Sequence, residues 1–452
     1  MSECHFDLIV IGTGPSASTV ANKSAVNGKQ VAVIESRGFG GTCALRGCNP
    51  KKVYTNAAEM RDRASGGKGK LVEFDQLRID WEKLLAFKRT FTEPVAEESE
   101  KSFHEQGIKT FAGTASFAGP NAIQVGKQRL SAERIFVGVG AQVRPLNIPG
   151  GQLAVNSDEF LELSKIPPRV VFIGGGYISM EFACVVARYG ATVTVLHRGA
   201  QVLKQFDADL VGQLVEYSSQ HGVDVQTNAK VTAIERQGDH SLVVKFDRLG
   251  QDLSIESDLV VHGAGRVPNF EGLNLEAGKI AFGADGIEVD PYMRSLTNPA
   301  VFAAGDCADT GKPRLTPTAN EEARIVAKNL FADVPAERPD YGVIPQVAFT
   351  VPSIATIGMS QPEARESHDV DVRYKNTSTW GSVRKTGQTC AGYKILIDKE
   401  TDLILGAHLL GPAAEETINL FALAMKHGLT ATDMKSTLFA FPTFASDVRR
   451  MV

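Results

Sequence analysis

Two cysteines stand close together near the start of the chain, in the segment Cys43-Ala-Leu-Arg-Gly47-Cys48. Two neighbouring thiols can form a disulfide that releases and takes up two electrons, or they can bind zinc. In a regular helix their Cα atoms would be separated by a rise of about 7.5 Å, beyond the roughly 7 Å limit for a disulfide. A disulfide therefore requires an irregular turn, which Gly47 and Pro50 permit. A zinc site would need further ligands, and the neighbouring sequence offers none.

Two glycine-rich segments have the form of a phosphate-binding turn. Gly12-Thr-Gly14-Pro15-Ser16-Ala17 follows a strand predicted at Phe6–Ile11, and Gly174-Gly-Gly176-Tyr177-Ile178-Ser179 follows a strand predicted at Arg169–Ile173. Such a turn lets the backbone approach a pyrophosphate closely, and the helix that follows it adds N–H donors.

Each turn is followed by a helix and then by a second strand. These second strands are predicted at Gln30–Ile34, with Glu35 at the end, and at Thr192–Leu196, with His197 at the end. The first glycine and the strand-end residue are 23 positions apart in both cases. Two units of equal spacing predict two dinucleotide-binding domains.

The residue at the end of the second strand indicates which nucleotide each domain binds. Glu35 can accept hydrogen bonds from both ribose hydroxyls and would repel a 2′-phosphate, which favours an unphosphorylated adenosine such as that of FAD. The second unit instead has His197 and Arg198, with Lys204 downstream, and cations favour a 2′-phosphate. We therefore expect NADPH in preference to NADH. The alternative is a solvated basic loop.

The segment Gly40-Gly-Thr-Cys43-Ala-Leu-Arg-Gly-Cys48-Asn-Pro-Lys51-Lys52 resembles the redox-active disulfide motif of the pyridine nucleotide–disulfide oxidoreductases, in the glutathione reductase and dihydrolipoamide dehydrogenase group. The resemblance covers nearly the whole chain, because further motifs fall in the family's order: Gly113–Phe117, Gly265–Asn269, Ala304–Asp306, Leu315–Pro317 and Ile344–Thr350. It implies an α/β fold with two Rossmann-like dinucleotide-binding domains and a C-terminal α+β dimerisation domain. The expected boundaries are 1–145 and 264–335 for the FAD domain, 146–263 for the NAD(P)H domain and 340–452 for the dimerisation domain.

The resemblance also implies roles for individual residues. Cys48 would lie next to the flavin and Cys43 would attack the substrate, while Lys51, paired with Glu181, would stabilise charge on the reduced ring. Tyr177 resembles the gate over the nicotinamide side of the flavin. The other expected FAD contacts are Gly12, Gly14, Pro15, Ser16, Ala17, Glu35, Gly41, Thr42, Ala115, Gly140, Asp306 and Thr316. The other expected NADPH contacts are Gly174, Gly176, Ile178, His197, Arg198, Lys204, Gly265 and Arg266.

The C-terminal segment departs from the family pattern. Disulfide reductases of the family carry His-Pro-Thr with a carboxylate five residues after the histidine, and this pair holds and passes the proton of thiol exchange. Here Phe441 replaces the histidine and Ser446 replaces the acid, while Asp447 lies one place away. A positioned acid–base is typically worth about 10²–10⁴-fold in rate, so ordinary disulfide turnover is expected to be slow.

The residues expected to line the substrate pocket match those of glutathione reductases only in part. Arg324 matches a cationic contact of glutathione reductases, but Asn22 stands in place of another, and an acid, Glu100, stands at a tyrosine position. An acid disfavours an anionic peptide. Phe441 and Phe444 are the remaining candidates for lining the pocket.

We therefore expect an NADPH-dependent FAD oxidoreductase that reduces a small disulfide or related sulfur compound. The family arrangement implies a homodimer whose substrate sites are shared between subunits. The alternatives are a flavin reductase for a quinone, a metal ion or a C–S bond, as in ketopropyl coenzyme M carboxylase, and a catalytically silent redox-sensing dimer.

The composition excludes several other classes of protein. Lys plus Arg total 48 and Asp plus Glu total 52, for a net charge of −4, which gives no basic surface for nucleic acid or an anionic membrane. No apolar run reaches the roughly 20 residues of a membrane span, and the first residues lack a basic leader. We expect a cytoplasmic protein without a bound metal.

Overall fold

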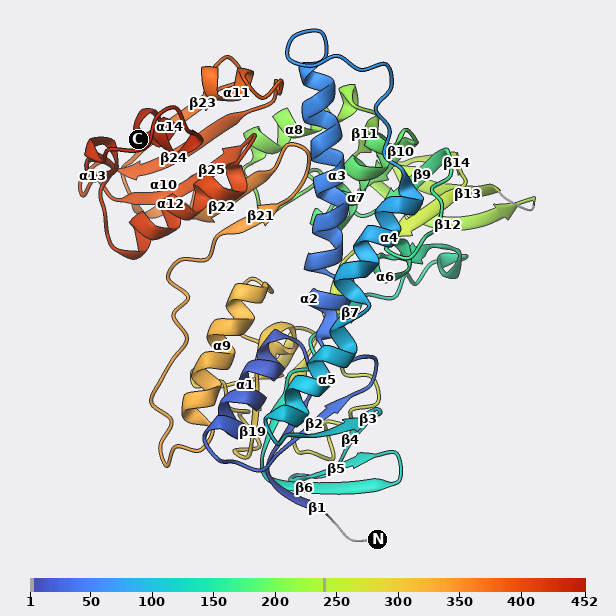
Figure 1. Cartoon of the computed structure of the whole chain (residues 1–452), viewed down its shortest axis with the longest axis vertical. Helices are drawn as coiled ribbons and strands as arrows, with labels where there is room; N and C mark the ends of the chain where they lie inside the picture. The colour runs from blue at the N-terminus through green and yellow to red at the C-terminus, as the bar shows by residue number, and fades with distance from the viewer. Residues whose placement is uncertain (1–3, 239–240) are drawn as a thin grey trace. The chain divides into compact units, whose positions relative to one another are not determined.

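The computed structural model describes residues 4–238 and 241–452 (Figure 1). The chain forms two compact units, each assembled from three segments. Unit 1 consists of Met1–Lys51, Lys88–Arg144 and Arg266–Tyr341, and unit 2 consists of Lys52–Phe87, Pro145–Gly265 and Gly342–Val452. Two of the divisions fall inside helices, namely α3 (Cys48–Gly67) and α4 (Trp81–Thr92).

Unit 1 is built on one seven-stranded sheet. Its strands are β3 (Lys109–Ala112), β2 (Val31–Glu35), β1 (Cys4–Ile11), β6 (Gln128–Val137), β5 (Ala122–Val125) and β4 (Ala115–Gly119) in spatial order, with β19 (Val301–Ala303) also beside β6. The helices α1 (Pro15–Val26) and α9 (Thr316–Asn329) pack side by side (Figure 1), and α5 (Val95–Glu105) completes the layer. Unit 1 also contains a small sheet of β7 (Ala141–Val143) and β16 (Arg266–Pro268) and another of β17 (Phe282–Gly283), β18 (Gly286–Glu288) and β20 (Ala308–Asp309), with the short helix η2 (Gly305–Cys307) before β20.

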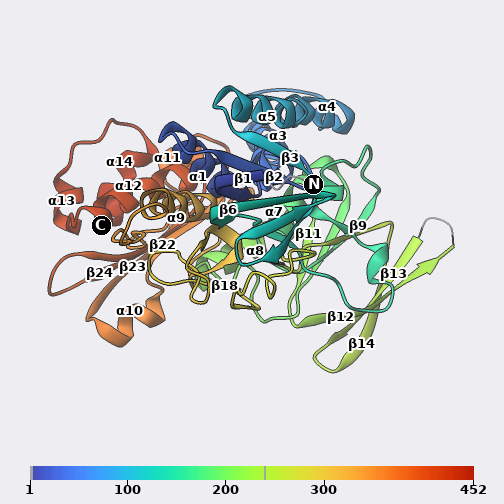
Figure 2. The same cartoon turned by 90° about the horizontal axis from the view of Figure 1, so that it is seen from below.

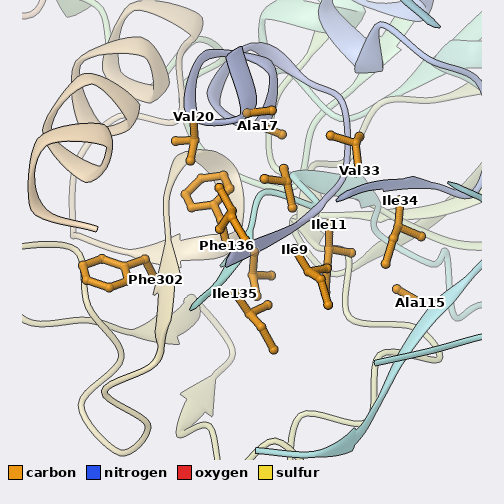
Figure 3. Close-up of a cluster of buried hydrophobic side chains, with 14 of the residues drawn as sticks. Ile9, Ile11, Ala17, Val20, Val33, Ile34, Ala115, Ile135, Phe136 and Phe302 are labelled. Carbon is orange, nitrogen blue, oxygen red and sulfur yellow. The ribbon is translucent and has the colours of Figure 1, made fainter. Parts of the chain in front are cut away.

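The core of unit 1 forms because its central strands are apolar on both faces, as parallel strands covered on both sides must be. β1 pairs in parallel with both β2 and β6. Ile9, Val33 and Phe136 of these strands are fully buried together with Ala17 and Val20 of α1 (Figure 3). This packing fixes the turn between β1 and α1, on which the first predicted nucleotide site depends.

The described residues of unit 2 form three sheets. The parallel sheet has the order β11 (Val223–Gln226), β10 (Thr192–Leu196), β9 (Arg169–Ile173), β15 (Leu259–His262) and β8 (Val155–Asn156). The second sheet is antiparallel and has the order β12 (Ala229–Gln237), β13 (Ser241–Arg248) and β14 (Gln251–Ser257), which lie beside each other in Figure 2. The C-terminal sheet has the antiparallel order β21 (Gln346–Ala348), β22 (Ile354–Gly358), β25 (Ile404–Leu410), β24 (Gly392–Asp398) and β23 (Val370–Asn376).

Unit 2 contains most of α3 and the first part of α4. Its other described helices are η1 (Gly151–Leu153), α6 (Ser157–Phe160), α7 (Tyr177–Tyr189), α8 (Ala208–Gln220), α10 (Gln361–Ser367), α11 (Gly381–Arg384), α12 (Ala414–Lys426), α13 (Ala431–Ser436) and α14 (Phe444–Met451). In residues 4–238 and 241–452, every helix is too short or too polar to cross a bilayer.

The predicted α/β fold class is confirmed. The sheet of unit 1 is mixed, because β5 and β4 pair in antiparallel fashion at the edge of its parallel strands, whereas the first sheet of unit 2 is parallel throughout, and the C-terminal region is α+β. The predicted first-unit strand Gln30–Ile34 is found one residue later, as β2, so that Glu35 is its last residue. In the C-terminal region the sequence predicts strands at Tyr393–Ile397 and Leu403–Leu409 and a helix near Glu415–His427. They are present as β24, β25 and α12, with ends shifted by one residue.

Candidate active site

The two redox-candidate cysteines belong to unit 1 and lie on either side of a break between two helices. Cys43 lies in α2 (Gly41–Arg46), and Cys48 is the first residue of α3. The break is at Gly47, where φ is −133° and ψ is −113°. A Cβ at Gly47 would lie 2.8 Å from the Thr42 carbonyl oxygen, so only glycine lets the chain turn this tightly. The turn therefore has the irregular form that a disulfide between these cysteines requires.

The cysteines are present as two thiols, and Cys43 is hydrogen-bonded to Cys48. The Thr316 hydroxyl donates a hydrogen bond to the Cys43 sulfur at 3.4 Å and lies 3.8 Å from the Cys48 sulfur. The hydrogen bond to Cys48, followed by burial, raises the pKa of the Cys43 thiol above its ordinary value, and the Thr316 hydroxyl acts in the opposite direction. Thr316, expected at the flavin, thus also contacts both sulfurs.

The first glycine turn fits a pyrophosphate. Gly12 has a φ of +102°, and a Cβ there would collide with the carbonyl oxygen of Gly138. A Cβ at Gly14 would meet no protein atom within 4 Å, so the backbone there faces open space. No described side chain caps α1, which leaves its first N–H groups for a ligand, and Pro15 stands at the first position. The residues present therefore fit the FAD that the resemblance implies.

Hydrogen bonds orient the carboxylate of Glu35 at the end of β2. One carboxylate oxygen accepts a hydrogen bond from the Thr13 hydroxyl at 2.6 Å, and the other accepts from the backbone N–H groups of Ser36 and Arg37. Thr13 also accepts from Gly40 N–H at 3.0 Å, which ties the turn to the segment before Cys43. Thr13 was not among the residues predicted from the sequence, although its place between the two turn glycines could have indicated it.

Asp306 lines a small pocket of unit 1 with Arg314, Thr318 and Glu322. Burial raises the pKa of the Asp306 carboxyl, while Arg266 and Arg314 act to lower it. Glu322, which the sequence analysis also missed, accepts a hydrogen bond from Gly305 N–H at 2.7 Å and so supports the turn that carries Asp306.

The second glycine turn, in unit 2, has the same features as the first. Gly174 has a φ of +101°, and a Cβ there would lie 2.8 Å from the Gly263 carbonyl oxygen. Gly176 precedes α7, which no described side chain caps, and a Cβ at Gly176 would find its nearest atom 4.0 Å away. Tyr177 is 40% exposed at the start of α7. The turn therefore fits a second dinucleotide.

Glu181 is buried on α7 and makes two contacts within unit 2. One carboxylate oxygen accepts a hydrogen bond from Phe349 N–H at 3.0 Å, and the other lies 3.4 Å from the ammonium of Lys52. Lys52 is thus a partner that the sequence analysis missed. Lys51, the predicted partner, is buried and belongs to unit 1, and its pairing with Glu181 stays a prediction.

The C-terminal segment places the two predicted phenylalanines differently. Phe441 is 87% exposed, whereas Phe444 packs against the core of the C-terminal sheet and lies under the ammonium of Lys385. Ser446 belongs to a capping box at the start of α14: its hydroxyl accepts from Thr443 N–H and donates to the Thr443 carbonyl. Ser446 therefore serves the helix end rather than a proton relay.

Two of the three unit 1 side chains considered for substrate contact already have hydrogen-bond partners within unit 1. Nε and Nη2 of the Arg324 guanidinium donate hydrogen bonds to the two carboxylate oxygens of Glu321 on the same helix. The side-chain oxygen of Asn22 is buried on α1 and has no partner among the described residues. Glu100 accepts a hydrogen bond from Thr110.

The remaining predicted residues divide between the units. Unit 1 holds Ser16, Ala17, Gly41, Thr42, Ala115, Gly140 and Arg266, and unit 2 holds Ile178, His197, Arg198, Lys204 and Gly265. Arg266, predicted to contact NADPH, donates to the Ala141 carbonyl within unit 1. The described residues contain no cluster of three or more His, Cys, Asp or Glu side chains suited to a metal ion.

Comparison with protein families matches two models to the chain. The model of the pyridine nucleotide-disulphide oxidoreductase matches residues 6–323, and the model of the dimerisation domain of the same family matches residues 344–452.

Individual proteins similar to this chain include reductases of two kinds. A glutathione reductase of Burkholderia cepacia is 32% identical, over 99% of this chain and 98% of that protein. A mercuric reductase of Bacillus cereus is 29% identical, over 99% of this chain and 71% of that protein. Among solved structures, the Cu(II) complex of the HOCl-induced flavoprotein disulfide reductase RclA from Escherichia coli has a TM-score of 0.88 and 25% identity, and the match covers 100% of this chain and 99% of that chain.

Proposed function

Because the chain belongs to the pyridine nucleotide-disulphide oxidoreductase family, we propose that it passes electrons from NADPH through FAD to Cys43 and Cys48, and on to a small disulfide or related sulfur compound. It is a flavoprotein oxidoreductase with sites for FAD and NADPH. The observation that carries the proposal is the break between α2 and α3, where the sulfurs of Cys43 and Cys48 lie 3.4 Å and 3.8 Å from the same Thr316 hydroxyl.

Bound FAD supplies a two-electron carrier between NADPH and a disulfide. The turn at Gly12 and Gly14 would hold the FAD pyrophosphate, with Glu35 on the adenosine ribose. The turn at Gly174 and Gly176 would hold the NADPH pyrophosphate. Lys51 and Glu181 would form the ion pair beside the flavin.

The two thiols would then reduce the substrate disulfide in two exchange steps, which together transfer two electrons to the substrate. Cys43 attacks one sulfur of the substrate, which forms a mixed disulfide and releases one substrate thiolate. Cys48 next attacks the Cys43 sulfur, which closes the protein disulfide and releases the second thiolate. Each thiolate needs a proton, and without the histidine at position 441 the transfer loses about 10²–10⁴-fold in rate.

A metal ion is the second candidate acceptor. Two thiolates are soft donors that suit Hg(II), and also the Cu(I) that forms when Cu(II) is reduced. Hg(II) would take up two electrons to give Hg(0), and two Cu(II) ions would take up one electron each to give Cu(I). Neither reduction needs a proton for a leaving thiolate. The mercuric reductases among the relatives and the Cu(II) complex of the structural relative favour this alternative. A quinone, a C–S bond or a silent redox-sensing role are weaker alternatives.

An anaerobic experiment tests the electron path. NADPH is added to the oxidised holoenzyme, and we expect a long-wavelength thiolate-to-flavin absorbance that disappears in Cys48→Ser. Cys4→Ser, which changes an exposed cysteine elsewhere in unit 1, is the matched control and keeps the band. Full bleaching of the flavin without the band would contradict the proposal. Turnover is then compared for oxidised glutathione, lipoamide, quinones, Hg(II) and Cu(II).

We also propose a cytoplasmic homodimer in which each substrate site takes Cys43 from one subunit and Phe441 from the other. The family dimerisation domain and the exposed apolar side chains Leu438 and Phe441 support this arrangement. Mixed dimers of Cys43→Ser and Phe441→Glu chains test it. Shared sites leave one intact site per mixed dimer, and therefore about half of the wild-type turnover. Sites within single chains leave none intact.

A further inference from the structure

His197 hydrogen-bonds to the glycine turn that precedes it in the sequence. The backbone N–H of Gly175 donates to Nδ1 of His197 at 3.1 Å. Nδ1 is therefore the acceptor, and the neutral ring carries its proton on Nε2. The side chain predicted as a cation for the 2′-phosphate is thus already bonded to the middle residue of the pyrophosphate turn.

Gly175 is held from several sides by the loop at 197–204. Its carbonyl oxygen accepts a hydrogen bond from Leu203 N–H at 2.8 Å. A Cβ at Gly175 would lie 2.9 Å from Cγ of His197 and would collide with the Val202 side chain. The turn and the basic loop are therefore one hydrogen-bonded and closely packed structure.

The surroundings of His197 favour the neutral ring. Burial lowers its pKa, a backbone hydrogen bond at Gln201 opposes this, and the neighbouring Arg198 guanidinium lowers it further. A Cβ at Gly199 would lie 2.9 Å from Nε2, so backbone also lies close to the other ring nitrogen. Arg198 and Lys204, by contrast, are exposed.

We infer that His197 is a positioning residue that fixes the Gly175 turn for the dinucleotide pyrophosphate, rather than a cation that binds the 2′-phosphate. This inference rests on the proposed NADPH site. Its consequence is that His197 contributes equally to the binding of NADPH and NADH, because both carry the pyrophosphate. Arg198 contributes to the binding of NADPH only.

Isosteric variants of the FAD-loaded enzyme separate the two ring nitrogens. His197→Gln places an amide near the Nε2 position and loses the Nδ1 acceptor, whereas His197→Asn keeps an oxygen acceptor near Nδ1. Calorimetric titration with NADP⁺ and NAD⁺ is expected to show both dissociation constants raised about three- to tenfold in His197→Gln, the worth of one hydrogen bond. In His197→Asn both stay within about twofold of wild type. Arg198→Gln is expected to weaken NADP⁺ binding alone.

Two results would contradict the inference: a loss in His197→Gln confined to NADP⁺, or an equal loss in His197→Asn and His197→Gln. FAD content and melting temperature establish that each variant is folded. A wild-type enzyme that bound neither nucleotide would instead contradict the proposed function. The two failures are therefore distinguishable.

Discussion

At the scale of single residues, the chemistry of the site depends on what surrounds the Cys43 sulfur. Its neighbours Cys48 and Thr316 have opposite effects on its pKa, and burial adds to the effect of Cys48. A raised thiol pKa keeps the thiolate scarce at neutral pH, and the thiolate is the nucleophile. The Thr316 hydroxyl is thus the identified side chain that favours the reactive form.

Replacing Thr316 by valine is expected to slow alkylation of Cys43 in the reduced holoenzyme by about three- to tenfold at fixed pH, because a hydrogen bond to the thiolate is lost. In the wild type the rate is expected to continue rising with pH above 9, since the pKa of Cys43 lies above its ordinary value. The measurement is the iodoacetamide rate at Cys43, followed by peptide mass. Thr316→Ser keeps the hydroxyl and serves as the control; equal rates for valine and serine would refute the role of Thr316.

At the scale of secondary-structure elements, two helix ends carry residues of the predicted sites, one in each unit. The end of α2 at Gly47 brings Cys43 and Cys48 together. The start of α14 is closed by the Thr443–Ser446 capping box, a position at which glutamate is common. In the family pattern, the acid that orients the histidine would therefore also cap this helix.

Gly47→Ala tests the break between α2 and α3. The new Cβ would meet the Thr42 carbonyl oxygen, and overpacking of this kind costs about 1–3 kcal/mol. We expect closure of the disulfide by a dithiol oxidant to slow by roughly tenfold or more, measured as the loss of titratable thiols. Gly38→Ala is the matched control, because its Cβ would make only an ordinary 3.7 Å contact with Leu45. Unchanged kinetics in Gly47→Ala would show that the turn tolerates a side chain.

Phe441→His alone is expected to raise disulfide turnover less than about tenfold, because Ser446 supplies no carboxylate to orient the imidazole. The double variant Phe441→His/Ser446→Glu keeps a capping residue and adds the acid, so we expect a gain approaching about 10²-fold. Steady-state turnover with oxidised glutathione measures both. A large gain from Phe441→His alone would contradict this reasoning.

At the scale of the whole molecule, the three segments of unit 2 meet at one buried ion pair. Arg188 of α7 donates to Asp62 of α3 at 2.8 Å and to the Val351 carbonyl at 3.1 Å. Asp62 also accepts hydrogen bonds from Tyr217 and Gln388. α3 and α7 each begin at a predicted site, so this network anchors both of the helices on which those sites depend.

Arg188→Met is expected to lower the free energy of unfolding by about 3–5 kcal/mol, because it leaves the Asp62 carboxylate buried without its cation. The control is Arg63→Met, which removes the exposed pair with Glu59 on the same helix and is expected to cost at most about 0.5 kcal/mol. Urea unfolding curves of the two holoenzymes provide the measurement. Equal losses of unfolding free energy in the two variants would show that the buried ion pair stabilises the protein no more than the exposed pair does.

The sequence by itself determined the elements and the residue types of the site. Apolar strands, glycine turns and the cysteine motif are local patterns, and local patterns set local backbone geometry. The turn at Gly12, the acid at Glu35 and the need for an irregular turn at Gly47 could therefore be inferred from spacing alone.

Only the tertiary structure decided which side chains meet. The contacts of Thr316 with Cys43, of Lys52 with Glu181 and of His197 with Gly175 join residues far apart in the chain. No periodicity encodes such contacts, because they follow from how strands and helices pack around a shared core. His197 shows the same effect of packing. Its residue type predicted a cation, but in the structure its ring lies next to the Gly175 N–H and accepts a hydrogen bond from it.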